Sequence, residues 1–195
     1  MNRPDTSAAL EANVATTTAL LQQLPALAAQ LQRAVDVIGD ALLNGHKLLC
    51  AGNGGSAADC AHFAAEIAGR FVLDRPGFPA IDLTANHSLT TALINDYPPA
   101  ELFARQVRAL AAPGDVLVVL STSGNSENIC LALEAAGEMK LTRVALLGRD
   151  GGRCKSLADI ALIVPGDETA RIQEAHLLLY HTICQVLDPL LAAGR

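Results

Sequence analysis

The 195-residue chain carries 14 Lys and Arg residues against 20 Asp and Glu residues, which gives a formal net charge of −6, and 51% of its residues are hydrophobic. An acidic chain without a basic run is a poor match for a nucleic-acid surface or an anionic membrane. No apolar run approaches the roughly 18 residues of a membrane-spanning helix, and residues 1–5 lack the pattern of a signal peptide. We therefore expect a cytoplasmic protein that contacts neither nucleic acid nor membrane directly.

Aromatic residues make up only 3% of the chain, and tryptophan is absent. Alanine, leucine and valine must therefore fill the interior, which fits helices packed closely on a parallel sheet. The five cysteines are widely spaced and form no Cys-x-x-Cys motif. They indicate small buried hydrophobic side chains in a reducing compartment, not a disulfide framework or a cysteine zinc site.

Residues 6–44 carry a helical pattern that is interrupted at Pro25 and ends at Asn44-Gly45, with an apolar side that runs from Leu20 to Leu42. Such an arm can either cover the sheet or pack against another copy of the chain. We expect it partly at a subunit interface, because the helices of the sheet already cover both faces. Residues 1–46 are thus expected to form a helical oligomerisation arm, followed by one α/β domain at 47–195.

Strands and helices alternate from residue 47 onward, which predicts a three-layer α/β/α fold around a five-stranded parallel sheet. The strands are expected near 47–52, 80–83, 116–121, 143–148 and 160–165. Helices are expected near 56–69, 99–111, 126–139 and 169–193, with a short helix-and-loop region at 86–96 and a glycine turn at 151–152. Ligands of such sheets bind beyond the carboxyl ends of the strands, where the strand order reverses.

Two Gly/Ser-rich stretches, residues 52–56 and 121–126, each lie between a predicted strand and a predicted helix. Backbone N–H groups of such a turn and of the helix start suit a phosphate oxyanion, and serine hydroxyls add donors. The alternative is an ordinary connection in which glycine makes the turn and Ser126 caps the helix. Two such stretches favour a phosphorylated ligand, whereas the absence of P-loop and dinucleotide motifs disfavours a nucleotide.

His62 and Glu66 are four residues apart in the helix expected at 56–69, so their side chains lie on one face, one turn apart. This pair suits zinc when a further ligand arrives from elsewhere, and the carboxylate can instead serve as a general base. A solvated pair on a helix surface is the alternative. The apolar neighbours Phe63 and Ile67 indicate a face that is not open to solvent.

The last predicted helix holds Gln173 and His181 next to an apolar side. These two residues are eight positions apart, or about 12 Å along the helix axis, so they can meet at one ion only if both side chains lean inward. Taken alone, His181 is more often a packed or surface histidine than a catalytic one.

Three parts of the chain carry most of these polar residues: Gly52-Asn53-Gly54-Gly55-Ser56-Ala57-Ala58-Asp59 with His62-Phe63-Ala64-Ala65-Glu66, then Ser121-Thr122-Ser123-Gly124-Asn125-Ser126, and Arg171-Ile172-Gln173-Glu174-Ala175-His176. In combination they resemble the phosphoheptose isomerases, also called sedoheptulose 7-phosphate isomerases, of the SIS (sugar isomerase) domain class. The resemblance extends through essentially the whole chain. It implies a flavodoxin-like sheet, a homotetramer with active sites near subunit contacts, and one zinc ion per subunit.

The resemblance also implies the site residues. The catalytic pair would be Glu66 and His181, and the zinc ligands would be His62, Glu66, Gln173 and His181. The sugar phosphate would contact Asn53, Gly54, Gly55, Ser56, Glu66, Asn95, Asp96, Ser121, Thr122, Ser123, Ser126 and Gln173.

The implied reaction is the isomerisation of D-sedoheptulose 7-phosphate to D-glycero-D-manno-heptose 7-phosphate through an enediolate, the first step toward ADP-heptose and lipopolysaccharide heptose. A replication factor that binds the bacterial replication initiator shares the fold and much of the serine motif, but it lacks the acid and the imidazole that this chain has at Glu66 and His181. A sugar-phosphate-sensing regulatory domain is disfavoured, because no DNA-binding module accompanies the domain. One departure from the family pattern is Ala170, where some isomerases carry Asp just before the arginine.

Overall fold

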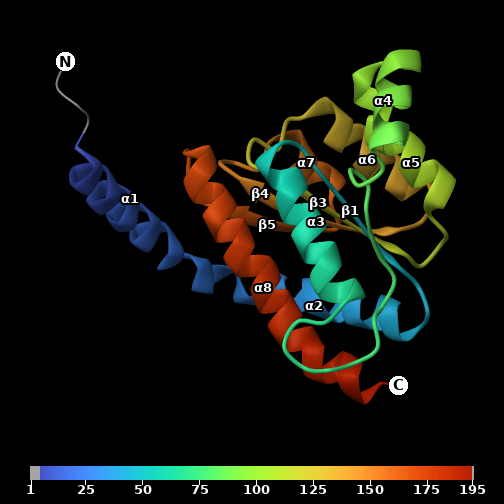
Figure 1. The fold of residues 1–195 in the computed structure, drawn as a ribbon, viewed down its shortest axis with the longest axis horizontal. Coiled ribbons are helices and arrows are strands. Elements are labelled where there is room, and N and C mark those ends of the chain that lie inside the picture. The colour runs from blue at the N-terminus through green and yellow to red at the C-terminus, as the bar shows by residue number, and fades with distance from the viewer. Residues whose placement is uncertain (1–4, 195) are drawn as a thin grey trace.

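A five-stranded parallel sheet lies between two layers of helices in the computed structural model, which describes residues 5–194 (Figure 1). The strand order is β2-β1-β3-β4-β5, and all four neighbouring pairs are parallel. The strands are β1 (Leu48–Gly52), β2 (Ala80–Asp82), β3 (Val116–Ser121), β4 (Thr142–Gly148) and β5 (Ile160–Val164). The predicted three-layer fold is therefore confirmed, with every strand within one residue of its expected bounds.

The helices agree with the predicted pattern, with one addition. They are α1 (Thr6–Leu21), η1 (Leu24–Leu27), α2 (Ala28–Leu43), α3 (Gly55–Ala68), α4 (His87–Asp96), η2 (Pro99–Glu101), α5 (Leu102–Leu110), α6 (Glu127–Glu138), α7 (Gly152–Leu157) and α8 (Thr169–Ala193). The sequence analysis missed α7, because it interpreted the paired glycines at 151–152 only as a turn. Gly151 adopts a left-handed φ of 87° as the residue before this helix, so the glycine turn is real and a helix follows it directly.

The hydrophobic core has two parts, one on each face of the sheet. Alternate strand residues point to opposite faces, so Cys50 packs with α2, α3 and α8 whereas Leu49 packs with α5 and α6. All five cysteines are buried and free, as expected. No helix among residues 5–194 is both long and apolar enough to cross a membrane.

The N-terminal arm divides into two helices with different surroundings. Helix α2 covers the sheet, and its residues Val35, Ile38 and Leu42 are buried in the core of their own chain. Helix α1 extends away from the body of the molecule (Figure 1), and only Leu20 of its residues is buried. The apolar side of the arm thus serves first to cover the sheet. A role of the arm in oligomerisation stays a prediction.

The strand order places both Gly/Ser-rich stretches side by side at the carboxyl-terminal end of the sheet. Strand β1 pairs with β2 on one side and with β3 on the other, so the order of strands reverses between β1 and β3. The stretch after β1 and the stretch after β3 leave the sheet at this point. Parallel α/β sheets bind ligands at such a position, which is where the two stretches were expected.

Candidate active site

A cavity of about 290 Å³ opens beyond the ends of β1 and β3. Most of the predicted phosphate-binding residues line it together with Leu120 and Thr169: Asn53, Gly54, Gly55, Ser56, Ser121, Thr122, Ser123, Ser126 and Gln173. None of these residues carries a charge, so the pocket offers neutral hydroxyl, amide and backbone donors. The sequence analysis missed Thr169, the first residue of α8, although its place at a helix start was a usable signal.

Within residues 5–194 no serine hydroxyl of this pocket donates a hydrogen bond, so each can donate to a ligand. Ser121 Oγ accepts from the backbone N–H of Gly124 at 3.1 Å, and Ser123 Oγ accepts from that of Asn125 at 3.2 Å. Ser126 occupies the N-cap position of α6, but its side chain makes no capping hydrogen bond. Ser126 is thus the N-cap residue, as the alternative has it, but its hydroxyl lines the pocket and does not cap the helix.

Two amide side chains tie the turn after β1 to neighbouring helices. Asn53 and Asn128 exchange two hydrogen bonds of 2.9 Å, so each amide is held by the other. A Cβ atom at Gly55 would lie 2.5 Å from Nε2 of Gln173, so a larger residue there would push the Gln173 amide away from this turn. Gln173 thus connects α8 to the phosphate-type pocket.

A second group of polar side chains lies where α3 faces α8. The candidate ligand atoms of His62, Glu66 and His181 all lie within 4.8 Å of one another. His62 Nε2 is 2.9 Å from Glu66 Oε1, and the rings of His62 and His181 meet edge to face with centroids 5.0 Å apart. The Glu66 side chain is only 22% exposed. The His62 side chain is 44% exposed, so the pair is partly open to solvent, and the nearby ring of His181 distinguishes it from an isolated surface pair.

This group, which we call the histidine cluster, fits a metal ion. Burial lowers the pKa of His181, the nearby His62 lowers it further, and Glu66 opposes both, so the net shift favours the neutral ring that a metal ligand needs. His181 Nε2 is buried and has no hydrogen-bond partner among the described residues. Two imidazole nitrogens and a carboxylate oxygen are a donor set that zinc prefers. The three side chains therefore provide the ligands for one cation.

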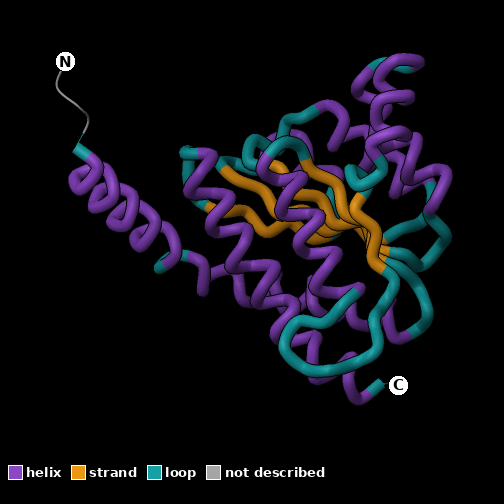
Figure 2. Tube along the Cα trace, in the orientation of Figure 1, coloured by secondary structure: helices purple, strands orange, loops and turns teal. Residues whose placement is uncertain are grey.

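Three residues around the histidine cluster were not predicted from the sequence. The hydroxyl of Tyr180 lies 2.9 Å from His62 Nδ1. The Phe71 ring packs on His181 with centroids 5.7 Å apart. The loop that carries Phe71 curls beside the last turns of α8 (Figure 2), where Asp188 accepts from the backbone N–H groups of residues 72 and 73 and from Arg75 Nε. A carboxylate on the apolar side of α8 was the available signal for this anchor.

Asn95 and Asp96 are not brought into the serine-lined pocket. Both residues are exposed at the end of α4, where the Asn95 amide donates to Asp96 Oδ1 at 2.8 Å. They are not among the residues that line the 290 Å³ cavity. Their contact with substrate stays a prediction.

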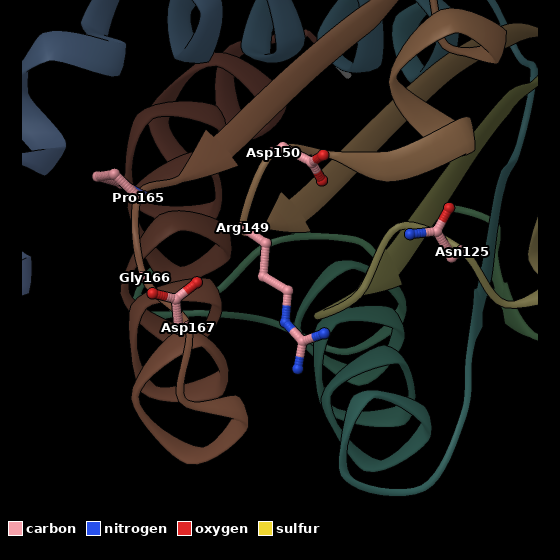
Figure 3. Close-up of a pocket in the computed structure, with 6 residues that line it drawn as sticks. All are labelled: Asn125, Arg149, Asp150, Pro165, Gly166 and Asp167. Carbon is pink, nitrogen blue, oxygen red and sulfur yellow. The ribbon is translucent and has the colours of Figure 1, made fainter.

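A larger cavity of about 500 Å³ adjoins the serine-rich turn at Asn125 (Figure 3). Its other lining residues are Arg149, Asp150, Pro165, Gly166 and Asp167. Arg149 adopts a left-handed φ of 58°, and Figure 3 shows its guanidinium extending between the first turns of α8 and α3. The sequence analysis did not predict this residue. Arg149 brings a positive charge to the carboxyl-terminal end of the sheet, where the neutral donors of the serine-lined pocket also lie.

Comparisons with known proteins agree with this geometry. The family model of the SIS domain matches residues 14–148. The phosphoheptose isomerase of Aliarcobacter butzleri is 50% identical over 158 residues, which cover 81% of this chain and 84% of the relative. That of Helicobacter pylori strain 26695 is 48% identical over 170 residues, which cover 87% and 88%.

The solved structure of the phosphoheptose isomerase GmhA from Neisseria gonorrhoeae superposes with a TM-score of 0.90 at 41% identity. The match covers 95% of this chain and all of that one. Sequence, fold and the placement of the serine-rich turns thus point the same way. The chain belongs to the SIS domain family and, within it, to the phosphoheptose isomerases.

Proposed function

We propose that this chain isomerises D-sedoheptulose 7-phosphate to D-glycero-D-manno-heptose 7-phosphate. The observation that carries the proposal is the pairing of a neutral, hydroxyl-lined pocket with a histidine–carboxylate cluster along one helix, α8, which supplies Gln173 to the first and His181 to the second. An aldose–ketose isomerase needs both, because it must anchor a distant phosphate while a base moves a proton between C1 and C2. The relatives named phosphoheptose isomerase support this choice over a replication factor.

The serine-lined pocket would bind the phosphate of the substrate. The hydroxyls of Ser56, Ser121, Ser123 and Ser126 would donate to its oxygens, as would the backbone at the left-handed Gly54. This anchor is far from the reacting carbons, so its binding energy would be used to position C1 and C2 against the catalytic groups.

Proton transfer would fall to the histidine cluster. Glu66 would remove the proton from one carbon and return it to the other, and His181, whose pKa burial lowers, would move the proton between O1 and O2. The two residues can exchange these roles. A ligand atom of each lies within 4.8 Å of the other, so one substrate position could serve both transfers.

Zinc would be held by His62, Glu66 and His181, with Gln173 as the fourth ligand that the family resemblance implies. When bound, zinc supplies a Lewis acid that stabilises negative charge on the enediolate oxygen. Glu66 has two carboxylate oxygens, so it can hold an ion with one and accept a proton with the other. His62 would act mainly as a ligand.

We also propose a cytoplasmic homotetramer that acts in lipopolysaccharide heptose synthesis. Support for the assembly comes from large apolar side chains exposed on the two helices at one side of the molecule: Leu10 and Val14 on α1, and Leu177, Leu178, Val186 and Leu190 on α8. Exposed apolar stripes of this kind on neighbouring helices gain most from burial against another copy.

The test is a turnover assay with the purified full chain. Sedoheptulose 7-phosphate would be supplied in deuterated water, with and without added zinc, while the aldose product and the deuterium in it are followed. We expect turnover, with deuterium entering at the carbons that exchange protons. No turnover under either condition, together with tight binding to the replication initiator protein, would favour the replication factor instead.

A further inference from the structure

We infer that Tyr180 is a positioning residue of the histidine cluster: its hydroxyl fixes the ring of His62 so that Nε2 faces the metal. This inference rests on the proposed zinc site but concerns a residue that the family resemblance does not assign. It follows from one contact of 2.9 Å between the Tyr180 hydroxyl and His62 Nδ1.

The Tyr180 side chain is itself held rigidly. It lies one residue before His181 on α8 and is completely buried. Its ring packs on Phe63 with centroids 5.5 Å apart and meets the His62 ring edge to face at 5.6 Å. Because these neighbours pack around the ring, they fix the position of the Tyr180 hydroxyl. The hydroxyl can then hold the more exposed His62 ring in one orientation.

The two contacts of His62 select one ring orientation. Nδ1 faces the Tyr180 hydroxyl, and Nε2 faces Glu66 Oε1, each at 2.9 Å. Turning the ring by 180° would place carbon atoms against both polar partners. Tyr180 and Glu66 together therefore disfavour the flipped ring, in which Nε2 would not point into the cluster.

A ligating histidine normally hydrogen-bonds through its other ring nitrogen, and this outer contact fixes both the ring and its tautomer. For Nε2 to hold an ion, Nδ1 must carry the proton, and the Tyr180 oxygen is then the acceptor. Phenylalanine at this position would keep the packing but leave Nδ1 without that acceptor. The loss should appear as weaker metal binding, since outer contacts of this type are typically worth about 10- to 100-fold in metal affinity.

The matched control is the other tyrosine of the chain. Tyr97 lies at the end of α4, where Arg105 stacks on its ring at 3.6 Å, and its side chain is 40% exposed. Tyr97→Phe removes the same hydroxyl from a tyrosine outside the histidine cluster. Any general effect of losing a phenol oxygen should therefore appear in both variants.

The experiment is a titration of zinc alone against a competing chromogenic chelator, with the metal-free full chain, Tyr180→Phe and Tyr97→Phe. We expect Tyr180→Phe to raise the dissociation constant for zinc about 10- to 100-fold and Tyr97→Phe to leave it unchanged. The Michaelis constant for sedoheptulose 7-phosphate should not change in either variant at saturating zinc, because the serine-lined pocket is untouched.

The outcomes separate this inference from the function on which it rests. If the unmodified chain does not bind zinc, the proposed metal site is wrong. If it binds zinc and Tyr180→Phe binds equally well, Tyr180 is not a positioning residue. Nitrogen-15 resonances of the His62 ring give a second readout that does not depend on the variant folding. In the zinc-loaded chain, zinc bound through Nε2 with the proton on Nδ1 supports the inference, and zinc bound through Nδ1 overturns it.

Discussion

The serine-lined pocket and the histidine cluster share helix α8 but are built in different ways. Most of the pocket consists of turns that follow two neighbouring strands, and the turn after β3 is shaped by contacts within a few residues, such as the bond from Gly124 N–H to Ser121 Oγ. The cluster consists of three side chains on α3 and α8, which are far apart in the chain. The first depends on local conformation, whereas the second depends on how two helices pack.

This difference predicts separate weak points. The packing of α3 on α8 relies on the contact of Phe63 with Tyr180 and on the loop that joins α3 to β2. That loop is anchored by the buried pair Arg75–Asp188, whose side chains are 1% and 3% exposed. Loss of this anchor should disturb the histidine cluster first, through Phe71, and should leave the serine-rich turns in place.

The largest expected effect is that of Asp188→Asn. Removing the charge leaves Arg75 buried without its partner, and breaking a buried ion pair on one side typically costs about 3–5 kcal/mol. We expect the free energy of unfolding in urea to fall by this amount. Asp159→Asn is the control, since the Arg143–Asp159 pair is 25% and 41% exposed and such a pair is worth about 1 kcal/mol or less. Equal losses in the two variants would contradict the role given to the loop anchor.

The second prediction concerns α8, the helix that the serine-lined pocket and the histidine cluster share. Burial lowers the pKa of His176, on the sheet side of α8, to about 4. An unfolded histidine has a pKa of about 6.5, so between these values the unfolded chain binds a proton that the native chain does not. Native stability should therefore be fully present above about pH 6.5 and should fall by roughly 3 kcal/mol as the pH approaches 4.

Denaturation in urea at a series of pH values measures this effect. His181 contributes in the same direction, because burial lowers its pKa also. The share of His176 is isolated by His176→Phe, which removes the titrating group and should flatten the curve. His87→Gln, at an exposed position on α4, controls for the loss of a histidine. If the free energy of unfolding depended on pH in His176→Phe as it does in the unmodified chain, then groups other than His176 would cause the loss of stability.

Local and tertiary contacts also explain how far the sequence predicted the site. Gly54 and the serines at 121–126 indicate phosphate-binding turns without knowledge of the fold, because strand, turn and helix start are contiguous in the sequence. His62 and Glu66 were found through their spacing of one helical turn. Tyr180 and Asp188 were missed, because the pattern of α8 identifies them only as residues of its buried side, and their partners lie more than 100 positions away. Helix α7 was missed because its glycines indicate a turn and its six residues are too few for a periodic signal.

Glu66→Gln should impair the proton transfer assigned to the histidine cluster and leave the substrate binding assigned to the serine-lined pocket. The amide keeps the shape of the side chain but cannot accept the carbon proton, so we expect the turnover number to fall about 10²-fold, or about 2.7 kcal/mol in the barrier. Substrate binding should be largely kept, because the serine-lined pocket is unchanged. Deuterium should no longer enter the product. Glu134→Gln, at an exposed position on α6, should behave as the unmodified chain. Full labelling and turnover in Glu66→Gln would remove Glu66 from the mechanism.

Ser123→Ala is the smallest expected effect and the complement of Glu66→Gln. It removes one hydroxyl donor from the serine-lined pocket, and a hydrogen bond to a charged group contributes about 1.5 kcal/mol or more. We expect the Michaelis constant for sedoheptulose 7-phosphate to rise about 10-fold while the turnover number at saturation changes little. Ser156→Ala, on α7, whose hydroxyl donates to the Arg153 carbonyl, is the control. If Ser123→Ala lowered turnover and left the Michaelis constant unchanged, then this half of the site would act in the transition state and not in binding.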